Sequence, residues 1–399
     1  MKNKRILAIF ILLLSAYSIL ISRLYYIQIW NREVLSERAR RQWMRVSHSK
    51  PLKSSIYDRK GRILAFSGYA DSFHINPRQI RNNKKDIAKL CEYLSLDKEA
   101  VTREINSSNS YFMWLKRKVE PEEAQRVKQL KINGVGYVKE KKRYYSEDRL
   151  ASTLLGIVGM DDQALSGIEL VVNGLVKENK TKIVYGRDAK GRYIDWDGRM
   201  AQNNPSGYVY LTIDKTIQYI AEKEIGECFE KMKPKWASVI VQDVRTGEIL
   251  AMAVYPRFSN NDFNSINRLQ QLNNYAIAHI FEPGSTFKII PFAAALEQNL
   301  YSLETKFDCH NGKFNVASLV IHDHDPKKIL SFAEVFEQSS NIGTAQIGMR
   351  AGKDKVYYYA RAFGFGTRTG IALPGESNGI LRNPKYLSLI HISEPTRPY

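Results

Sequence analysis

The pattern of hydrophobic and polar positions divides this chain of 399 residues into an apolar start and two longer mixed regions. Residues 6–22 form a run of 17 residues without a charge, between the basic residues 1–5 and Arg23. The run is at the short end for a membrane-spanning helix, and the aromatic-rich residues 24–30 extend it. No small-x-small cleavage site follows the apolar core, which favours an uncleaved anchor over a signal peptide. We therefore expect a cytoplasmic tail at 1–5 and a transmembrane anchor at 6–30.

Residues 31–205 alternate between helical and strand-like patterns. Residues 31–45 are charged and helix-compatible, and we expect them to form a stalk outside the membrane. Residues 51–65 predict a strand, an Asp-Arg-Lys-Gly turn and a second strand. Helical periodicity covers residues 85–130, with Pro121 at a helix start, and returns over 150–158. Residues 46–205 carry no catalytic constellation, so we expect a structural domain of mixed α/β type.

The composition shifts at residues 202–207, a polar stretch with Pro and Gly that indicates a linker. A β-rich segment at 208–214 precedes an amphipathic helix over 216–233. Two β-rich runs, 237–243 and 249–253, are joined by a Thr-Gly turn and predict a hairpin. We therefore expect a second domain at 206–386, an antiparallel sheet with flanking helices, and an α+β fold for the chain.

Charge and cysteine content narrow the possible partners. The chain has 60 basic and 41 acidic residues, a net charge of +19, which favours anionic partners such as nucleic acid, lipid or wall polymer. No zinc-finger or RNA-recognition signature is present and the basic residues are dispersed, so nucleic acid is not an expected partner. A solvated basic surface is the simpler interpretation. Three scattered cysteines, Cys91, Cys228 and Cys309, do not describe a disulfide framework.

The strongest candidate for chemistry is the pair Ser285 and Lys288. A Pro-Gly turn precedes the serine, and a long apolar segment follows the lysine, as at the start of a buried helix. Positions three apart share a helix face, so the lysine amine can reach the serine hydroxyl and act as its base. Ser-x-x-Lys also occurs at Ser47/Lys50 and Ser95/Lys98, in polar or turn-like surroundings. From local sequence alone, a helix cap and a nucleophile are both open for Ser285.

A second short pattern, Ser339-x-Asn341, lies 54 residues after Ser285. Ser-x-Asn also occurs at positions 107, 259 and 265, in polar stretches, whereas Ser339 opens a helix-compatible segment rich in small residues. Ser-x-x-Lys followed by Ser-x-Asn is two thirds of the signature of penicillin-recognising serine acyltransferases.

The surrounding sequence resembles the monofunctional (class B) penicillin-binding proteins, the membrane-anchored D,D-transpeptidases that cross-link peptidoglycan. The likeness covers nearly the whole chain. It includes the anchor, motifs of the non-catalytic pedestal, the start of the transpeptidase domain and a segment after Ser-x-Asn, at residues 23–28, 56–65, 155–159, 166–169, 211–218 and 365–376. Such proteins serve division, elongation or spore-cortex synthesis, and the resemblance favours the division and sporulation type without deciding among the three.

The resemblance implies a role for each motif residue. Ser285 would attack the penultimate D-alanine of a stem peptide and form an acyl-enzyme, with its backbone N–H in the oxyanion hole. Lys288 would accept the serine proton, Ser339 would relay it to the leaving amine, and Asn341 would hold Lys288 and the substrate amide. No metal or other cofactor is implied.

The resemblance also implies partners and a location. Peptidoglycan stem peptides and β-lactams would occupy the site, and the N-terminal helix would sit in the lipid bilayer. Cell-wall synthesis proteins such as a SEDS-type glycosyltransferase would be partners. The chain would be a single-pass membrane protein with a cytoplasmic N-terminus and an extracytoplasmic bulk.

The sequence departs from the family in its last part. The third motif, Lys-Thr/Ser-Gly, is absent; Lys180-Thr181-Lys182 and Arg368-Thr369-Gly370 are the nearest approximations. Family likeness continues to about residue 386, and residues 387–399 match nothing expected, so we expect a non-native tail there rather than a divergent natural end. We therefore expect an incomplete transpeptidase domain that acylates slowly or not at all.

Three further segments have alternative interpretations. Cys309-His310 and residues 322–325 (His-Asp-His-Asp) carry metal-ligand residue types, but their spacing favours polar loops near the active site. Residues 111–117, rich in aromatic side chains, indicate core packing of the pedestal rather than a partner surface. Residues 187–192 indicate a solvated hairpin turn rather than an anion site.

Two rivals to the transpeptidase interpretation stay open. One is a serine β-lactamase or β-lactam sensor, which the long pedestal disfavours. The other is a catalytically deficient scaffold that binds cell-wall partners, which the absent third motif favours.

Overall fold

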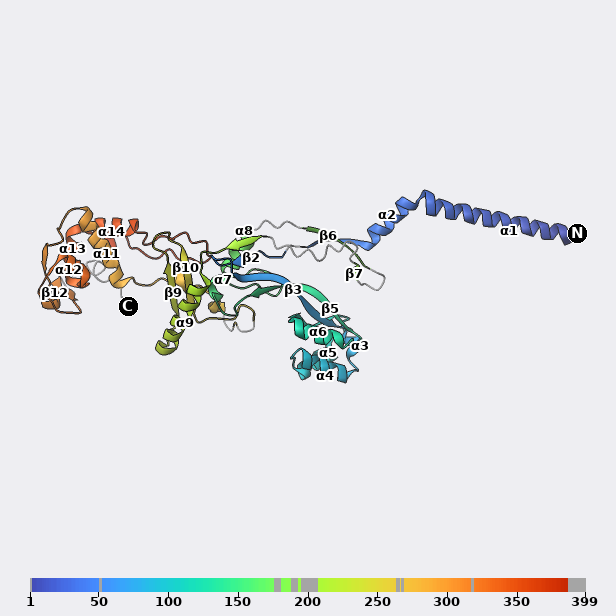
Figure 1. Ribbon diagram of the computed structural model, residues 1–399, viewed down its shortest axis with the longest axis horizontal. Coiled ribbons are helices and arrows are strands. Elements are labelled where there is room, and N and C mark those ends of the chain that lie inside the picture. The colour runs from blue at the N-terminus through green and yellow to red at the C-terminus, as the bar shows by residue number, and fades with distance from the viewer. Residues whose placement is uncertain are drawn as a thin grey trace. The chain divides into compact units, whose positions relative to one another are not determined.

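The chain divides into two compact units in the computed structural model (Figure 1). The described residues are 2–49, 52–175, 181–187, 193–194, 207–262, 266, 269–316 and 319–386. The first unit consists of Met1–Tyr57, Ile63–Ser146 and Gly174–Leu211, and the second of Asp58–Arg62, Glu147–Asn173 and Thr212–Tyr399. The expected tail at 387–399 and the expected linker, apart from Gly207, lie outside the described residues.

The N-terminal part is helical. Helix α1 (Lys2–Tyr25) continues into a π-helical turn, η1 (Tyr26–Trp30), and a polar helix, α2 (Arg32–Trp43), follows. By length and composition, Ile9–Trp30 could cross a membrane, and its large apolar side chains are exposed. An apolar helix with no buried face is compatible with a lipid environment.

Strand β3 (Ile63–Ile75) is the centre of a five-stranded sheet in the first unit. It pairs antiparallel with β5 (Val135–Tyr145) over eleven residues, from Ala65↔Tyr145 to Ile75↔Val135. Its other edge pairs with β2 (Ser55–Tyr57) near the start and with β4 (Met113–Val119) near the end. The parallel strand β8 (Tyr208–Tyr210) extends β2. The predicted strand–turn–strand at 51–65 is thereby confirmed.

A second sheet of this unit has three antiparallel strands. Its order is β1 (Met44–Ser49), β6 (Thr181–Arg187) and β7 (Tyr193–Ile194). The pairing of β6 with β7 agrees with a hairpin, and its turn residues 188–192 lie outside the described residues.

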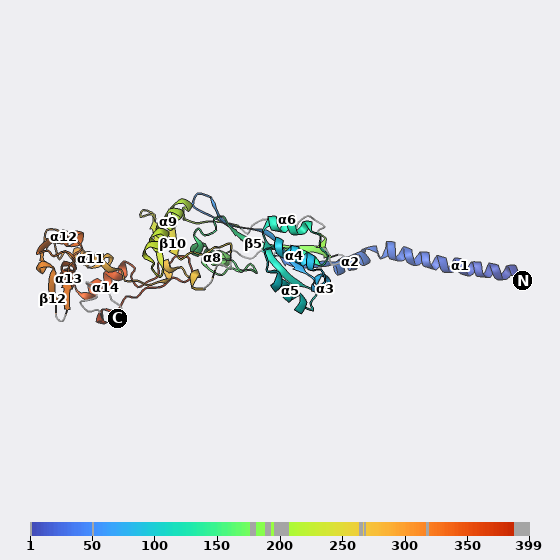
Figure 2. The same ribbon diagram turned by 90° about the horizontal axis from the view of Figure 1, so that it is seen from below.

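One layer of helices gathers beside β3 and β5 (Figures 1 and 2). Its members are α3 (Pro77–Ile80), α4 (Lys84–Tyr93), α5 (Lys98–Ser107) and α6 (Pro121–Gln129). Asn83 and Asp97 cap α4 and α5, and Pro121 begins α6 as predicted. The core contains Phe73 and Ile75 from β3, packed with apolar residues from all four helices.

Two helical predictions in this part of the chain were wrong in extent. Residues 113–119 form β4 instead of a helix, because Met113 and Leu115 pack on the core while Trp114 between them does not. Over 150–158 only the short α7 (Ser152–Leu155) is helical. The alternation of core-facing and exposed side chains in β4 is short and lies within a longer helical pattern, so it is easily missed in the sequence.

In the second unit, helix α9 (Lys215–Met232) packs on the hairpin of β9 (Ala237–Gln242) and β10 (Ile249–Tyr255). Ala221 and Ile225 contribute to the contact from the helix, and small residues of β10 let the two elements approach. The buried Gln218 accepts from the Met252 amide at 2.7 Å and donates to its carbonyl at 3.0 Å. The predicted helix and hairpin are confirmed.

A group of helices and short hairpins forms the rest of the second unit. Helices α11 (Ile289–Glu297), α13 (Asn341–Ala351) and α14 (Lys353–Ala362) enclose one core, and α12 (Phe332–Glu337) adds to another. The hairpins pair β11 (Lys306–Asp308) with β14 (Ile329–Ser331), and β12 (Lys313–Val316) with β13 (Leu319–His322). The remaining elements are α8 (Gly167–Leu175), η4 (Leu269–Leu272), α10 (Tyr275–Ala278), η5 (Gly284–Lys288), η6 (His310–Gly312) and η7 (Pro384–Tyr386). The mixed α/β class is confirmed.

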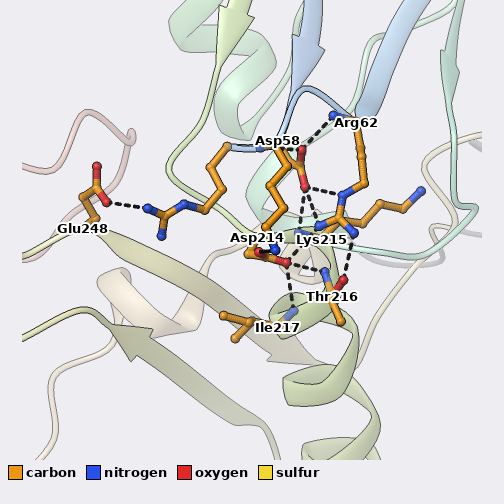
Figure 3. Close-up of polar contacts among 9 residues, drawn as sticks. Asp58, Arg62, Asp214, Lys215, Thr216, Ile217 and Glu248 are labelled. Carbon is orange, nitrogen blue, oxygen red and sulfur yellow. Dashed lines mark hydrogen bonds and ion pairs between the residues drawn. The ribbon is translucent and has the colours of Figure 1, made fainter.

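The turn between β2 and β3 belongs to the second unit, where it joins the start of α9 (Figure 3). Fully buried Asp58 accepts from the backbone of Lys60, Arg62 and Lys215, and from Arg62 Nε at 2.7 Å. Asp214 caps α9 and pairs with Lys60 at 2.7 Å and Arg62 at 2.8 Å. We call Asp58, Lys60, Arg62 and Asp214 the clip.

Hydrogen bonds in the clip set the charge of its carboxylates. The hydrogen bond with Lys60 holds the pKa of Asp214 well below its usual range, against the opposing effect of burial. Burial acts to raise the pKa of Asp58, but hydrogen bonds from Arg62, Lys215 and Lys60 outweigh it and leave the pKa lowered. Both groups are therefore carboxylates when the clip is formed.

Candidate active site

Ser285 lies in the tight helical turn η5, which leads into α11. Gly284 adopts φ +57°, a conformation that favours glycine and lets the chain turn sharply into η5. Ser285 is exposed, whereas Phe287 and Ile290 are buried in the core of α11 and α14. The N-cap position of η5 is Pro283, with no side-chain cap hydrogen bond, so Ser285 is not the helix cap. An exposed hydroxyl on an anchored turn is accessible to a substrate.

Lys288 lies one turn after Ser285 and is buried, with 5% of its surface exposed. Its Nζ donates to Ser339 Oγ at 3.0 Å and also to the Ser339 carbonyl oxygen. Residues 51 positions apart are thus joined, and the two candidate motifs meet at the amine. A buried amine needs such partners because an unpaired one would be costly.

Ser339 occupies the short connection between α12 and α13. Its φ is +55°, a left-handed conformation that is uncommon for a residue with a side chain. Ser340 caps α13 through Gly343 N–H at 3.0 Å, and its own N–H donates to the Val335 carbonyl at 3.0 Å. Strained backbone of this kind persists only where neighbours hold it, and it often occurs at functional sites.

Asp323, at the end of β13, holds this connection in place. Its carboxylate accepts from Ser340 Oγ at 2.7 Å, and from the backbone N–H groups of Asn341 at 2.6 Å and Ile342 at 3.0 Å. The Asn341 side-chain amide donates to the His322 carbonyl at 2.8 Å. A carboxylate at a helix N-terminus is stabilised by the free amides there. Asp323 therefore positions the residues that flank Ser339 and Asn341.

Sequence reasoning did not assign this role to Asp323. Its only signal was the acidic and histidine-rich segment 322–325, which was weighed as metal ligands or a polar loop. In the described part of the chain, His, Cys, Asp and Glu side chains form no group of three that could hold a metal. His310 stacks on Phe314 at 4.7 Å, and buried Cys309 lies 3.6 Å from Ser340 Oγ. Burial raises the pKa of the Cys309 thiol, which disfavours the reactive thiolate.

Arg368-Thr369-Gly370, the segment nearest to a Lys-Thr/Ser-Gly motif in this part of the chain, lies in a loop that hydrogen bonds to Glu376 hold together. Thr369 donates through its N–H at 2.6 Å and its hydroxyl at 2.5 Å to Glu376, and Gly370 N–H adds a contact at 3.3 Å. The hydrogen bond from Thr369 lowers the pKa of the Glu376 carboxyl. These residues form no strand, and Glu376 occupies the donors of Thr369 and Gly370.

The four predicted residues lie on two segments that meet at Lys288 and Ser339. Lys288 and Ser339 are in direct contact, Asn341 begins the helix two residues later, and Ser285 shares the turn of Lys288. A hydroxyl, an amine and a second hydroxyl in series can activate a nucleophile and move its proton to a leaving group. The arrangement suits acyl transfer through a serine.

Two family models match the chain. The penicillin binding protein transpeptidase domain matches residues 237–394, and the penicillin-binding protein dimerisation domain matches residues 48–205. Among solved structures, a peptidoglycan synthetase from Bifidobacterium adolescentis has the same fold, with a TM-score of 0.60 at 23% identity. It covers 89% of this chain, which covers 70% of that structure.

Three curated relatives span nearly the whole chain. Stage V sporulation protein D of Bacillus subtilis is 31% identical over 95% of the chain. Peptidoglycan D,D-transpeptidase FtsI of Buchnera aphidicola is 30% identical over 93%, and the probable peptidoglycan D,D-transpeptidase PenA of Neisseria gonorrhoeae is 26% identical over 96%. The chain spans 59% of the first relative's length and 66% of the other two.

Proposed function

The chain belongs to the class B penicillin-binding proteins, and from this membership we propose that it cross-links peptidoglycan by serine acyl transfer. The observation that carries the proposal is the contact of buried Lys288 with Ser339, one helical turn from exposed Ser285. It joins the two motifs of the family in one proton path. The substrate is the D-Ala-D-Ala end of a stem peptide.

The reaction has two halves. Ser285 Oγ bonds to the carbonyl carbon of the penultimate D-alanine, the bond from that carbon to the terminal D-alanine nitrogen breaks, and an ester remains on the serine. The serine proton passes to Lys288 and then through Ser339 to the leaving amine, so no net proton is gained or lost. An amine of a neighbouring stem peptide then attacks the ester and restores the Ser285 hydroxyl.

Two groups stabilise this path without changing covalently. The Ser285 backbone N–H, near the start of η5, donates to the developing oxyanion. Asn341, next to the Ser339 turn, orients the substrate amide. Their common contribution is to bind the transition state more tightly than the substrate.

The proposed location is the cell membrane. The helix Ile9–Trp30 is the anchor, with Lys2, Lys4 and Arg5 on the cytoplasmic side and the two units outside the cell. A membrane-anchored cross-linking enzyme works beside the enzyme that polymerises the glycan, so the partner we propose is a SEDS-type glycosyltransferase. The length and composition of the helix support the anchorage.

A time course with a fluorescent penicillin tests the proposal. A β-lactam ring opens on the same serine and leaves a stable acyl-enzyme, so any labelling is expected to be slow and to be abolished by Ser285→Ala. Ser95→Ala, in the other described Ser-x-x-Lys sequence, is the matched control and should label like the parent. Rapid labelling would contradict the expectation of slow or absent acylation, whereas labelling that persists in Ser285→Ala would overturn the proposed activity.

A further inference from the structure

The first unit carries an exposed aromatic cluster that the proposed reaction does not use. Strand β4 alternates between the two faces of its sheet. Met113 and Leu115 pack on the core under the helices, while Phe112 and Trp114 are 45% and 39% exposed. The expectation of core packing for residues 111–117 is therefore wrong for the aromatic members of the segment.

The rings of the cluster hold one another in fixed positions. His74 of β3 stacks on Phe112 at 4.7 Å, and Phe112 meets Trp114 edge to face at 4.9 Å. Gly136, opposite His74 on β5, leaves the space for this, because a Cβ there would lie 2.5 Å from the His74 ring. Exposed rings that are preorganised in this way bind a ligand with little loss of entropy.

Arginines flank the rings on both sides. Arg78 lies over the ring of Tyr111 at 4.2 Å and donates to its hydroxyl at 2.8 Å. Arg117 lies 5.3 Å from the ring of Trp114 and is fixed by two hydrogen bonds to Glu140, at 2.6 and 2.9 Å. Arg78 forms no ion pair among the described residues, so its guanidinium can meet an anionic ligand beside the rings.

A second stack lies along the same face of the sheet. Phe66 and Tyr144 face each other at 5.3 Å, and Lys142 lies over the Tyr144 ring at 5.1 Å. Phe66 and His74 are eight residues apart on β3, an even number, and the register with β5 is unbroken between them. They therefore share a face, about 27 Å apart at 3.4 Å per residue. Two ring sites in line suit a long repeating ligand.

We propose that this face, from the His74–Phe112–Trp114 cluster to the Phe66–Tyr144 stack, binds the anionic glycan strand of peptidoglycan. The C–H faces of sugar rings pack on aromatic rings, whose faces carry negative charge density. Carboxylates on the strand pair with Arg78. The ligand class rests on the proposed function, whereas the surface is separate from the Ser285 site. An acidic protein partner is the competing occupant.

Co-sedimentation tests the proposal. The full chain in detergent is mixed with beads that carry glycan strands from which an amidase has removed the stem peptides, which leaves a lactyl carboxylate on every second sugar. We expect binding that weakens with added NaCl and is weaker for uncharged chitin. Phe112→Ala combined with Trp114→Ala should lower the affinity at least about tenfold, because aromatic anchors dominate such contacts.

Three controls separate the possible outcomes. Tyr358→Ala, another exposed aromatic side chain, and Ser285→Ala should both bind like the parent. Two single variants serve if the double variant fails to fold. Phe112→Ser, in the loop before β4, should weaken binding in the same assay. Glycan should quench the tryptophan fluorescence of the parent, and this quenching should be lost in Trp114→Phe. Unchanged binding by the aromatic variants, or binding that needs stem peptides and Ser285, would overturn the proposal. A failure of penicillin labelling alone would leave the glycan surface unaffected.

Discussion

The buried amine of Lys288 is the residue on which the proposed chemistry depends most. Methionine has nearly the shape of lysine but no amine. Lys288→Met therefore removes both the proposed base and the hydrogen-bond donor to Ser339. We expect the rate constant of acylation by a fluorescent penicillin to fall by about 10²–10⁴-fold, the usual contribution of general base catalysis. Lys98→Met, in the other described Ser-x-x-Lys sequence, is the matched control and should leave the rate unchanged. A similar loss in both variants would contradict the assignment.

Asp323 should affect acylation without touching the substrate. Asp323→Ala removes the acceptor of Ser340 Oγ and of two amides at the start of α13, so the Ser339 turn loses its support. We expect acylation to slow by about 10–100-fold, as misplaced catalytic groups do, with a stability loss of about 1 kcal/mol for a missing cap. Asp323→Asn, which keeps an acceptor, should recover part of the rate.

Asp325→Ala is the control for Asp323, because Asp325 belongs to the same loop and its side chain is 83% exposed. It should acylate like the parent. Equal effects of Asp323→Ala and Asp325→Ala would mean that the loop as a whole, and not one carboxylate, supports the turn.

The residues of the two motifs could be predicted, but their support could not. Ser285, Lys288, Ser339 and Asn341 follow from short patterns and a family likeness that lie along the chain. Asp323 acts through three contacts that exist only after β13 and α13 meet. No local pattern distinguishes it from Asp325 two residues later, so only the tertiary structure assigns its role.

At the scale of elements, the clip joins the 58–62 turn to α9 through charge. Folding lowers the pKa of Asp214 from its value of about 3.9 in the unfolded chain. The charged carboxylate therefore stabilises the fold fully at pH values above about 3.9, and this stabilisation is lost as the pH falls towards the pKa in the folded chain. Asp214→Asn keeps a capping side chain and removes only the charge. Its destabilisation should therefore be largest near pH 6 and shrink as the pH falls below about 4.

Differential scanning fluorimetry between pH 7 and 3 measures this effect as the difference in midpoint between parent and Asp214→Asn. A difference that is constant over the range would show that hydrogen-bond geometry, and not the charge of Asp214, holds the turn. Arg62 donates to both Asp58 and Asp214. Arg62→Ala should therefore remove a partner of both carboxylates at once and lower the midpoint of unfolding.

Packing between α12 and α13 sets a second limit at this scale. A Cβ at Gly343 would lie 2.5 and 2.6 Å from the two methyls of Val335 and 3.1 Å from its Cβ, so the side chain or the backbone would have to shift. We expect Gly343→Ala to cost about 1–3 kcal/mol, the range for overpacked cores, despite the gain in helix propensity. Adding Val335→Ala should restore part of the stability and of the acylation rate.

Gly174→Ala in α8 is the matched control, because a Cβ at that helical position meets nothing within 4 Å. It should be neutral or stabilising, since only the propensity gain remains. A loss in Gly174→Ala equal to that in Gly343→Ala would exclude close packing as the cause.

Elements with strong local signals were predicted best. Asp214 and the amphipathic pattern after it mark α9, and the Thr-Gly turn marks the β9–β10 hairpin. Strand β4 was missed because it lies between helices α5 and α6 and spans seven residues, too few for a period of two to stand out. Its pairing partner, β3, is distant in sequence, and this pairing decides that the segment is a strand.

At the scale of the whole molecule, the two units combine an apolar helix, a basic first unit and the serine arrangement in one chain. Family likeness predicts this combination, whereas the exposed rings of the first unit appear only when β4 takes its place in the sheet. Among the described residues, only the helix Ile9–Trp30 qualifies as a membrane span. The proposed topology therefore requires that the aromatic surface of the first unit and the serine site of the second lie on the same side of the membrane.

Cysteine labelling tests that topology. Cys228 is exposed on α9, and Cys91 and Cys309 are buried, so a membrane-impermeant maleimide should label intact protoplasts at Cys228 alone. Cys228→Ser should abolish this labelling. In that background, Lys4→Cys should react only after the cells are lysed, because the basic residues before the helix stay in the cytoplasm. Labelling of Lys4→Cys in intact protoplasts, or of Cys228 only after lysis, would reverse the proposed orientation and remove the serine site from the compartment that holds its substrate.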